Sequence, residues 1–574
     1  MSMEKISITI NGETVVADQG KTVLEVAMEH GVEIPSLCFH PDVETAHHCG
    51  MCAIEIKGED YLKHACATVV TEGMEIVTES EAITQRRTEK LDGILAKHLL
   101  ECDDCVWGGR CKLLELVRKF GAKPIAKKDE RNHVVQVDTV VFDQTKCIGC
   151  ENCLNVCPIG FLEMNEYGKV SCSSDERKQC ISCGQCIIHC PVGAIEGAGE
   201  FEELEKVFQD KEKIIVVQFA PSIRTSIGEE FGMEAGTIAT GKLVSALRKL
   251  GFNSVFDAAA AADFTTMEES NELIEKLTTN TGLPIMTSCC PAWVKFVEFY
   301  YPEFIPHLAT SRSPQIMLGG IIKSYWSKKN NIDPKNIIVA SVMPCVSKKY
   351  EIKREELKIE GNYPVDMVLT TRELARLLKK NNIDLKTIDE GEADSPLGSP
   401  SGAGVIYGSS GGVFESALRT TYFTLTGTNM PADAVREIRG AEGIKMKEFT
   451  IGERLVKVCV VSGIRNAKKM LDEIKEHPGL FDALEVMACP GGCVNGGGQP
   501  VPSDKKMVQK RAEALYAIDD KSAIRCAHEN QEVQKIYEEF FTSEEVRKKI
   551  LHTHFAPSMK AEIKSLKNSK ETYE

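Results

Sequence analysis

Cysteine spacing is the feature of this sequence that most constrains its fold. The chain has 23 cysteines in 574 residues, and most of the N-terminal ones recur at intervals of two or three residues. In a small secreted chain such a content would indicate disulfides, but here the chain is long and its thiols stand at ligand spacings. The cysteines therefore predict several metal-binding modules rather than a disulfide framework.

Length and charge exclude several classes of protein. The chain is too long for one hydrophobic core, which predicts a modular protein. No apolar run approaches the 18 or so residues of a membrane helix, and MSMEKISITI lacks a signal-peptide core, so we expect a cytoplasmic protein without a membrane partner. The net charge of -15 argues against nucleic acid as a partner.

The texture of the chain changes near residue 200. Residues 5–17 alternate around Asn11-Gly12, which predicts a hairpin, and residues 21–31 predict a helix closed by Gly31. Beyond residue 210, strand candidates alternate with amphipathic helices, which predicts a large α/β domain. These candidates are strands at 214–219 and 337–342 and helices at 268–280 and 371–380. The Lys-rich tail from Lys560 is expected to be frayed.

Two cysteine runs match the two-cluster bacterial ferredoxin pattern, in which the fourth ligand of each [4Fe-4S] cluster comes from the other run. Zinc is the alternative, but a doubled eight-cysteine pattern with both prolines disfavours it. The pattern predicts one cluster on Cys147, Cys150, Cys153 and Cys190, and a second on Cys180, Cys183, Cys186 and Cys157.

Two further modules precede this run. Cys38, Cys49, Cys52 and Cys66 can hold a [2Fe-2S] cluster, with zinc or unrelated core cysteines as alternatives. Their spacing departs from plant-type ferredoxins and resembles the domain that opens the large iron-sulfur subunit of respiratory NADH dehydrogenases and several hydrogenases. One imidazole and three thiolates can then complete a [4Fe-4S] cube, although the same set could bind zinc. These four ligands are His98, Cys102, Cys105 and Cys111.

Three motifs after residue 210 carry widely separated thiols that can meet only through the fold. They are TSCCPAW at 287–293, MPCVSKK at 343–349 and EVMACPGGCVNGGGQ at 485–499. Together they predict a second, buried metal assembly. In sequence and order they resemble the signature motifs of the catalytic chain of [FeFe]-hydrogenases, and the resemblance covers nearly the whole chain.

The resemblance implies an H-cluster and the reaction 2H⁺ + 2e⁻ ⇌ H₂. Cys290, Cys345, Cys489 and Cys493 would hold its [4Fe-4S] cubane, and Cys493 would bridge to a diiron unit with carbonyl, cyanide and azadithiolate ligands. The implied cofactors are thus one [2Fe-2S] cluster, three accessory [4Fe-4S] clusters and the H-cluster.

The resemblance also implies a proton path. Cys289 would pass protons between the azadithiolate amine and Glu269, and Glu272 would follow on the same helix face. Without the resemblance, the spacing of these glutamates would predict only a solvent-exposed helix face. Two departures stand out, because the family's intermediate hydroxyl falls at Ala309 and its outer arginine at Lys276. A water or Thr310 could fill the first gap.

Further residues are implied around the diiron unit. Lys348 would donate to one cyanide, and the segment containing Ala220, Pro221 and Ser222 would surround the other. The residues implied to wall the pocket are Met343, Met487, Gln315 and Tyr407, the last standing where Phe is expected.

The sequence has neither a Rossmann fingerprint nor a P-loop, so electrons must come from outside the chain. We expect ferredoxin or flavodoxin as carrier, and maturation proteins to install the diiron unit. The eight basic and three acidic residues of 110–131 could form a docking face or a solvated linker.

Two alternatives stay open. The chain could be the hydrogenase subunit of an NAD-linked, electron-bifurcating or formate-coupled complex with flavin-bearing partners, although the lack of cysteine motifs after Cys526 favours a standalone enzyme. It could also be a hydrogenase-like iron-sulfur scaffold without the diiron site, which Cys289, Lys348 and Cys493 oppose.

The expected architecture is a multidomain α+β and α/β chain of four parts. These are a β-grasp [2Fe-2S] ferredoxin domain (1–80), a one-histidine, three-cysteine [4Fe-4S] module (81–125), a two-cluster bacterial ferredoxin domain (126–210) and a large α/β H-cluster domain (211–574).

Overall fold

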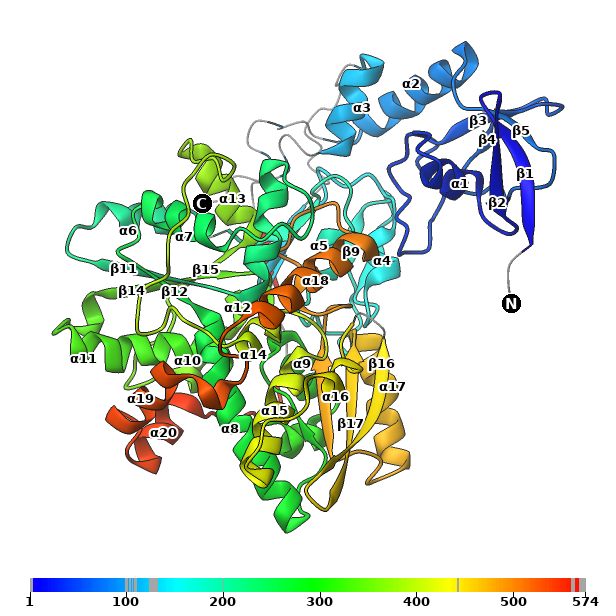
Figure 1. The fold of residues 1–574 in the computed structure, drawn as a ribbon. Coiled ribbons are helices and arrows are strands. Elements are labelled where there is room, and N and C mark those ends of the chain that lie inside the picture. Colours follow the sequence, from blue (N-terminus) through cyan, green and yellow to red (C-terminus); the bar gives the residue numbers. More distant parts are fainter. Residues whose placement is uncertain are drawn as a thin grey trace.

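A small mixed sheet forms the N-terminal part of the chain, at the upper right of Figure 1. Strands β1 (Lys5–Ile10) and β2 (Glu13–Asp18) pair antiparallel through Asn11 and Gly12, both at positive φ. Helix α1 (Val23–Glu29) begins with a capping box between Thr22 and Glu25. The predicted hairpin and helix are thus confirmed. The sheet order is β2-β1-β5-β3-β4, with β3 (Ala53–Ile56), β4 (Lys63–His64) and β5 (Glu75–Val77).

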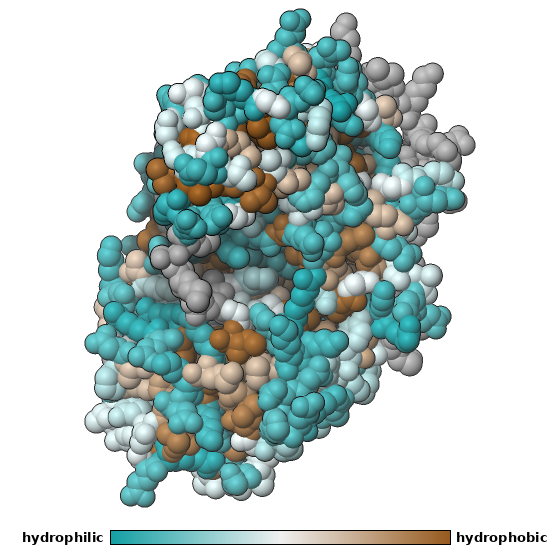
Figure 2. All heavy atoms as spheres, turned by 90° about the vertical axis from the view of Figure 1, so that its right-hand side faces the viewer, coloured by the Kyte–Doolittle hydropathy of each residue, from teal (hydrophilic) through white to brown (hydrophobic). Residues whose placement is uncertain are grey.

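The computed structural model describes residues 4–98, 102, 105, 107, 111–122, 133–199, 201–440, 443–558 and 563–566. Within these ranges, no helix has the length and apolar character needed to cross a bilayer. Figure 2 faces the side that carries the N-terminal sheet, and hydrophobic side chains there form separate groups among hydrophilic ones. The exposed large hydrophobic residues of this domain are Val16, Met28, Tyr61, Val69 and Val77.

The second part joins two helices to a small cysteine-rich sheet domain. The helices are α2 (Glu81–Leu95) and α3 (Lys112–Phe120). The sheet has the order β10-β7-β6-β19, and a separate hairpin and two short helices carry the cysteine loops. The bounds are β6 (Val134–Val137), β7 (Val140–Asp143), α4 (Asn152–Val156), β8 (Leu162–Met164), β9 (Val170–Cys172), α5 (Gln185–Ile188) and β10 (Ile195–Gly197).

The C-terminal tail corrects one sequence prediction. Strand β19 (Ile563–Leu566) pairs antiparallel with β6, from Ile563 opposite Val137 to Leu566 opposite Val134. The expectation of a frayed tail is therefore wrong for these four residues. The free edge of β6 supplies the backbone hydrogen-bond partners that a polar composition does not reveal.

A four-stranded parallel sheet forms the centre of the large domain, in the order β12-β11-β14-β15. Its bounds are β11 (Ile214–Phe219), β12 (Ser254–Asp257), β14 (Ile337–Met343) and β15 (Met367–Thr370). Helices α7 (Thr240–Leu250) and α13 (Thr371–Lys380) lie above it in Figure 1 and α10 (Pro314–Ile321) below, and all three share one buried cluster with the strands. The predicted strands and the helix at 371–380 are confirmed.

A second sheet, in the order β13-β18-β17-β16, completes this domain. Its bounds are β13 (Ile285–Met286), β16 (Ile444–Ile451), β17 (Arg454–Ser462) and β18 (Ala483–Met487), with only β16 antiparallel to its neighbour. Long helix α8 (Ala258–Thr279) packs against α10 and against α15 (Gly412–Thr426). The remaining helices before residue 500 are α6 (Phe201–Gln209), α9 (Pro291–Tyr300), α11 (Ser327–Lys329), α12 (Ser347–Glu351), α14 (Gly402–Val405), α16 (Ala432–Arg436) and α17 (Ile464–Glu476).

The last three helices wrap the large domain. They are α18 (Lys505–Lys521), α19 (Gln531–Glu539) and α20 (Glu544–Leu551). On α18, the fully buried Arg511 donates to both carboxylate oxygens of Glu229, at 2.7 and 2.6 Å. Because such a bidentate pair is charge-assisted and dry, it fixes α18 to the body of the domain.

Candidate functional site

The four cysteines of the N-terminal sheet domain converge. The Sγ atoms of Cys38 and Cys49 are 3.4 Å apart, and those of Cys52 and Cys66 are 3.3 Å apart. The Leu37 amide lies 3.5 Å from the Cys49 sulfur, and His47 Nδ1 lies 3.1 Å from that of Cys66. Four thiols in two adjacent pairs form a donor set suited to two irons.

His98 is buried and held through one ring nitrogen. Its Nδ1 lies 2.6 Å from the carbonyl oxygen of Lys146, next to Cys147. A ring fixed through Nδ1 to a backbone carbonyl leaves Nε2 for a metal, which is the arrangement found for metal-binding histidines. Cys105 and Cys111 pack around Trp107, whose indole nitrogen donates to Glu196 at 3.1 Å.

The ferredoxin-type cysteines separate into two groups. Cys147, Cys150, Cys153 and Cys190 line one cavity. Cys157 instead lies within electrostatic reach of Cys180, Cys183 and Cys186. This exchange of the fourth cysteine is the grouping that the doubled pattern predicts. Backbone amides donate to several of these sulfurs, among them those of Val170 to Cys147 and Ala194 to Cys190, each at 3.3 Å.

The first three cysteine groups lie next to one another. One buried cluster contains Cys38 and Cys49 together with Cys147, Cys150, Cys153 and Cys190. The rings of His40 and His189 also meet between these domains, with centroids 4.4 Å apart. The His98 group touches the same ferredoxin domain through Lys146.

The second ferredoxin group adjoins the large domain. The Cys489 sulfur lies 3.9 Å from the Cys183 carbonyl oxygen. The next residue, Gly184, packs on Gly497, so that a Cβ placed on Gly497 would lie 2.6 Å from the Gly184 Cα. Only glycine permits this approach of the two loops.

A cavity lined by cysteines opens where strands of both sheets end. β11, β13, β14 and β18 are followed directly by the segments that line it. Ligands of α/β proteins bind beyond the carboxyl ends of parallel strands, so this is where the topology places a cofactor site. The space in this cavity that the centre of a water molecule can occupy has a volume of about 80 Å³. Its lining includes Ala220, Pro221, Ser222, Cys289, Cys290, Gln315, Met343, Cys345, Lys348, Tyr407, Met487, Cys489 and Cys493.

The donor chemistry of this cavity fits a metal cluster with polar ligands. Burial raises the pKa of Cys290, and burial together with neighbouring thiols raises the pKa of Cys345 to about 12 and the pKa of Cys489 and Cys493 above the usual value. Such thiols ionise when a metal supplies positive charge. Ser222 Oγ and Gln315 Oε1 are buried without a hydrogen-bond partner. Unpaired buried polar atoms of this kind suit a ligand that accepts or donates there.

Lys348 is held at the wall of the cavity as a cation. Its ammonium donates to the Cys289 carbonyl oxygen at 3.1 Å and to Glu351 at 2.9 and 3.1 Å. Burial lowers the pKa of Lys348, but Glu351 more than offsets this and keeps the pKa above its usual value. Gln315 donates to the same Glu351 carboxylate at 2.9 Å.

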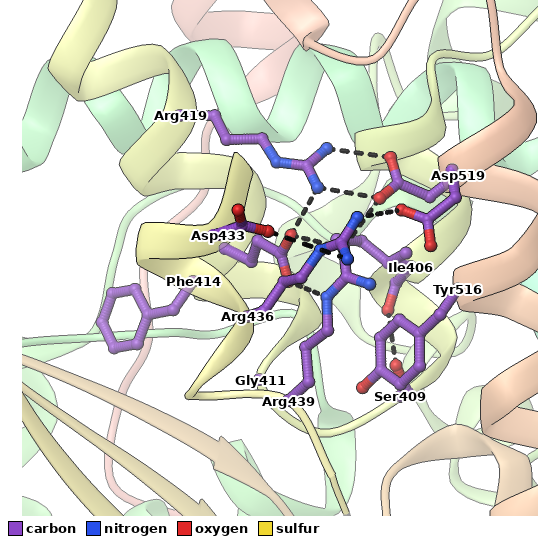
Figure 3. A network of polar contacts seen from close by, with 12 residues as sticks. Ile406, Ser409, Gly411, Phe414, Arg419, Asp433, Arg436, Arg439, Tyr516 and Asp519 are labelled. Carbon is purple, nitrogen blue, oxygen red and sulfur yellow. Dashed lines mark hydrogen bonds and ion pairs between the residues drawn. The ribbon is translucent and has the colours of Figure 1, made fainter. Parts of the chain in front are cut away.

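Tyr407 is positioned by α8 and α15. Its hydroxyl lies 2.9 Å from Thr266 Oγ1, which lies 2.6 Å from Ser416 Oγ. The segment that follows Tyr407 rests on a network of buried charges, shown in Figure 3. Asp519 of α18 accepts from Arg419 and Arg439, each at 2.8 Å, and Glu415 shares both arginines. Arg525 also donates to Asp519, at 2.7 Å.

Glu269 lies between the cysteine cavity and a second, smaller one. Burial, and then Glu272 and Glu485, raise the pKa of Glu269 to about 8. Its Oε1 is buried without a hydrogen-bond partner, and Glu269 is close enough to Cys289 to raise the pKa of that thiol. The smaller cavity is lined by Glu269 and Ala309, and its roughly 10 Å³ is about what one water needs.

Glu272 lies further out and contacts Thr310. Its carboxylate accepts from the Thr310 amide at 3.0 and 3.1 Å and from the Thr310 hydroxyl at 2.6 Å. Thr310 therefore binds Glu272, while the room beside Ala309 lies next to Glu269. Among the described ion pairs, Glu272 pairs with His552 at 3.5 Å and not with Lys276.

Sequence reasoning missed several residues of this region. Glu351 follows Lys348 by three residues on α12, a helical spacing that could have indicated the pair. Glu485 accepts from the amides of Gly411 and Phe414, and His552 comes from a segment 280 residues beyond Glu272; neither carries a local signal. Much of the basic stretch at 110–131, namely Arg110 and 123–131, lies outside the described residues.

Comparison with protein families identifies four matching segments. Residues 213–497 match the C-terminal domain of the iron only hydrogenase large subunit. Residues 3–81 match a 2Fe-2S iron-sulfur cluster binding domain, and 146–194 match a 4Fe-4S dicluster domain. Residues 505–558 match the iron hydrogenase small subunit, a unit that sequence reasoning did not separate from the large domain.

Whole-chain relatives agree with these matches. The chain is 36% identical to the NADP-reducing hydrogenase subunit HndD of Solidesulfovibrio fructosivorans over 96% of this chain and 99% of that protein. It is also 36% identical to iron hydrogenase 1 of Clostridium pasteurianum, over 93% and 96% of the two chains. A solved structure of the [FeFe]-hydrogenase HydA1 from Chlamydomonas reinhardtii matches with a TM-score of 0.56 and 35% identity, over 62% of this chain and 99% of that one.

Proposed function

This chain belongs to the iron-only hydrogenase family, and from that premise we propose how its own residues serve the reversible conversion of protons and electrons to hydrogen. It is an [FeFe]-hydrogenase with iron-sulfur domains. The observation that carries the proposal is the cavity at the strand ends, because every residue predicted to hold or surround the diiron unit lines it.

The residues of that cavity divide by role. Cys290, Cys345, Cys489 and Cys493 would hold the cubane, with the Cys493 sulfur also directed to the diiron unit. When bound, the H-cluster supplies an open iron and a basic amine for the heterolysis of hydrogen. The Lys348 ammonium, fixed by Glu351, would donate to one cyanide, and Ser222 would donate its unpaired hydroxyl to the other. Met343, Met487 and Tyr407 would keep the pocket closed to bulk water.

Proton transfer begins in our proposal at the Cys289 thiol and continues to Glu269. A thiol whose pKa is raised by burial stays protonated and can hand its proton on as it receives another. Glu269 suits the next step because its pKa of about 8 lies near the working pH of a cell. The small cavity beside Glu269 and Ala309 has room for one water, and Thr310 is already bonded to Glu272, which supports a water rather than Thr310 as substitute for the missing hydroxyl on the way to Glu272.

Electron transfer uses the accessory ligand groups. When bound, the accessory clusters supply one-electron carriers. Cys38 shares a buried cluster with the first ferredoxin group, and His98 contacts the same domain through Lys146, which supports two points at which electrons enter that group. The contact of Cys183 with Cys489 supports electron transfer from the second ferredoxin group into the large domain. We propose one [2Fe-2S] and three accessory [4Fe-4S] clusters in all.

We propose ferredoxin or flavodoxin as the carrier. The likeness to HndD, which is named as a subunit of an NADP-reducing hydrogenase, fits the complex-subunit alternative without favouring it, because iron hydrogenase 1 is equally identical to this chain. If this chain is such a subunit, it will co-purify with flavin-bearing or other partners, whereas a free enzyme will migrate as a monomer and turn over with ferredoxin alone. Cytoplasmic location and the need for maturation proteins stay predictions of the sequence.

Infrared spectroscopy of protein purified anaerobically from a host with the maturation system tests the proposal. We expect carbonyl and cyanide bands that shift under hydrogen, and their intensity should fall in Cys345→Ala. In Cys289→Ala we expect the bands to remain and hydrogen turnover to fall at least 100-fold. A wild-type protein that contains all its iron but shows no such bands, while a control hydrogenase matures normally, would instead favour the scaffold alternative.

A further inference from the structure

The outer end of the proton path has an unusual composition. Lys276 replaces the arginine that the family resemblance implies there. Burial lowers the pKa of Lys276, and within the described residues it has no carboxylate within ion-pair distance. A cation that does not touch Glu272 is a poor neighbour for passing protons to it.

His552, by contrast, is connected to Glu272 by hydrogen bonds. Its Nδ1 lies 2.8 Å from the Thr310 hydroxyl, which donates to Glu272 Oε1 at 2.6 Å. On the other side, its Nε2 lies 2.8 Å from Glu268 Oε2. The imidazole therefore bridges two carboxylates of α8, one on the predicted path and one beside it.

The backbone holds His552 in this place. The segment after α20 pairs with the segment before α10: Ser311 forms a bridge with His552, the Thr553 amide donates to the Thr310 carbonyl at 2.8 Å, and the Arg312 amide donates to Leu551 at 2.8 Å. Arg312 Nε also donates to the His552 carbonyl at 2.7 Å. A side chain positioned by its own backbone ladder is not an incidental surface contact.

The surroundings of the imidazole favour its charged form. Burial alone would lower the pKa of His552, but hydrogen bonds to Glu268 and Glu272 raise it to about 9. The other polar groups are the Tyr537 hydroxyl of α19, which donates to Glu268 at 2.5 Å, and Arg547 of α20, 3.8 Å from Glu268. As an imidazolium, His552 donates from both nitrogens, so the hydrogen bonds run in one direction from Nδ1 through Thr310 to Glu272.

We propose that His552, contributed by the segment that resembles the hydrogenase small subunit, is the outer proton relay of this enzyme, acting through Thr310 on Glu272. The Nδ1 proton passes to the Thr310 hydroxyl as that hydroxyl passes its own proton to the Glu272 carboxylate; the neutral imidazole keeps its Nε2 proton, which Glu268 accepts, and takes up a new proton from surface water at Nδ1. The imidazole thus returns to its starting charge, and no electron is exchanged. The side chain is 16% exposed, which places the end of this relay at the surface. The role rests on the proposed hydrogenase function.

Variants of the holoenzyme test the relay. We expect His552→Ala to keep the carbonyl and cyanide bands and to lose at least 10-fold in turnover, with several-fold recovery in added imidazole. His552→Gln should lose a similar factor without recovery, because the amide side chain fills the site. Thr310→Val should also slow turnover. His554→Ala is the matched control, since this histidine is exposed and two residues away, and it should keep the wild-type rate.

The opposite results would overturn the relay. These are a wild-type rate and pH profile in His552→Ala, a loss that imidazole does not restore, or a loss in Lys276→Met that His552→Ala does not share. A second measurement is independent of hydrogen turnover. In carbon-13 NMR of histidine-labelled protein before diiron insertion, the signal that is missing in His552→Gln is assigned to His552. This signal should titrate above pH 8 in the wild-type protein and at a lower pH in Glu268→Gln. Failure of the hydrogenase function itself would show separately, as wild-type protein without bands or turnover.

Discussion

Single buried groups set the pH behaviour of the site, and Glu269 is the sharpest case. Its pKa of about 8 is raised by burial above the usual 4.5, so the folded protein binds a proton that the unfolded chain has lost at neutral pH. The contribution of the protonated Glu269 to the stability of the folded protein is therefore lost as pH rises from about 4.5 to 8. We expect Glu269→Gln to raise the midpoint of thermal unfolding relative to wild type, by a margin that grows between pH 5 and pH 8, and to abolish turnover.

Thermal scans of wild type and variant at fixed scan rate, across that pH range, measure this margin. Glu275→Gln provides the control, because this glutamate is exposed on the same helix. A margin that is flat with pH would mean that Glu269 is ionised in the folded protein, and it would remove Glu269 as a proton donor near neutral pH.

The same residue scale shows what sequence could and could not predict. The cysteines of the cavity stand in long local motifs, so the residues of those motifs and their spacing predict the site from the sequence alone. His552 has no motif, and its partners Thr310 and Glu268 lie 242 and 284 residues earlier. Such a contact depends on the register between the segments after α20 and before α10, which no local pattern encodes.

Between elements, two glycine loops form the contact between the ferredoxin domain and the large domain, across which we propose that electrons pass. Gly497 is not at positive φ, so alanine is conformationally acceptable there, but its Cβ would clash with Gly184. We expect Gly497→Ala to separate the loops by a few tenths of an ångström or more and to slow electron transfer between them. The reduction of the accessory clusters by hydrogen, followed by visible bleaching in stopped flow, should become slower.

Isotope exchange between H₂ and D₂O, catalysed by the enzyme, separates this effect from damage to the cavity, because that exchange requires proton transfer but no net electron transfer. It should persist in Gly497→Ala. Gly93→Ala is a matched control, since nothing lies within 4 Å of the added Cβ in α2. Equal loss of exchange and bleaching would show that the substitution disturbs the diiron pocket and not the loop contact.

Elements with strong periodicity were predictable, as the strand at 214–219 and the helix at 371–380 show. Apolar runs and a capping box fix such elements locally. Strand β19 was not predictable, because Ile563–Leu566 becomes a strand only by pairing with the edge of β6, more than 400 residues earlier. The antiparallel joining of chain end and ferredoxin sheet belongs to tertiary structure alone.

At the scale of the whole molecule, the segment that resembles a small subunit is fastened to the catalytic domain by buried charge. Asp519 of α18 is fully buried and meets Arg419 and Arg439, which also bind Glu415 of α15 (Figure 3), as well as Arg525. Burial opposes its ionisation, but the arginines Arg419 and Arg525 lower the pKa of Asp519 to about 2. Its stabilising contribution is therefore present above about pH 4 and lost only as pH falls through about 2.

Removing this charge should loosen the segment and the Tyr407 loop together. Breaking a buried ion pair from one side costs about 3–5 kcal/mol. We expect Asp519→Asn to unfold at a clearly lower temperature by an amount independent of pH between 6 and 8, and to shorten the half-life of hydrogen turnover on heating. Asp520→Asn is the control, because that carboxylate is 40% exposed and its pairing with Arg436 should contribute below about 1 kcal/mol. If the two variants unfold alike, the network is not what holds the small-subunit segment in place, and the position of His552 must depend instead on its backbone pairing with residues 310–312.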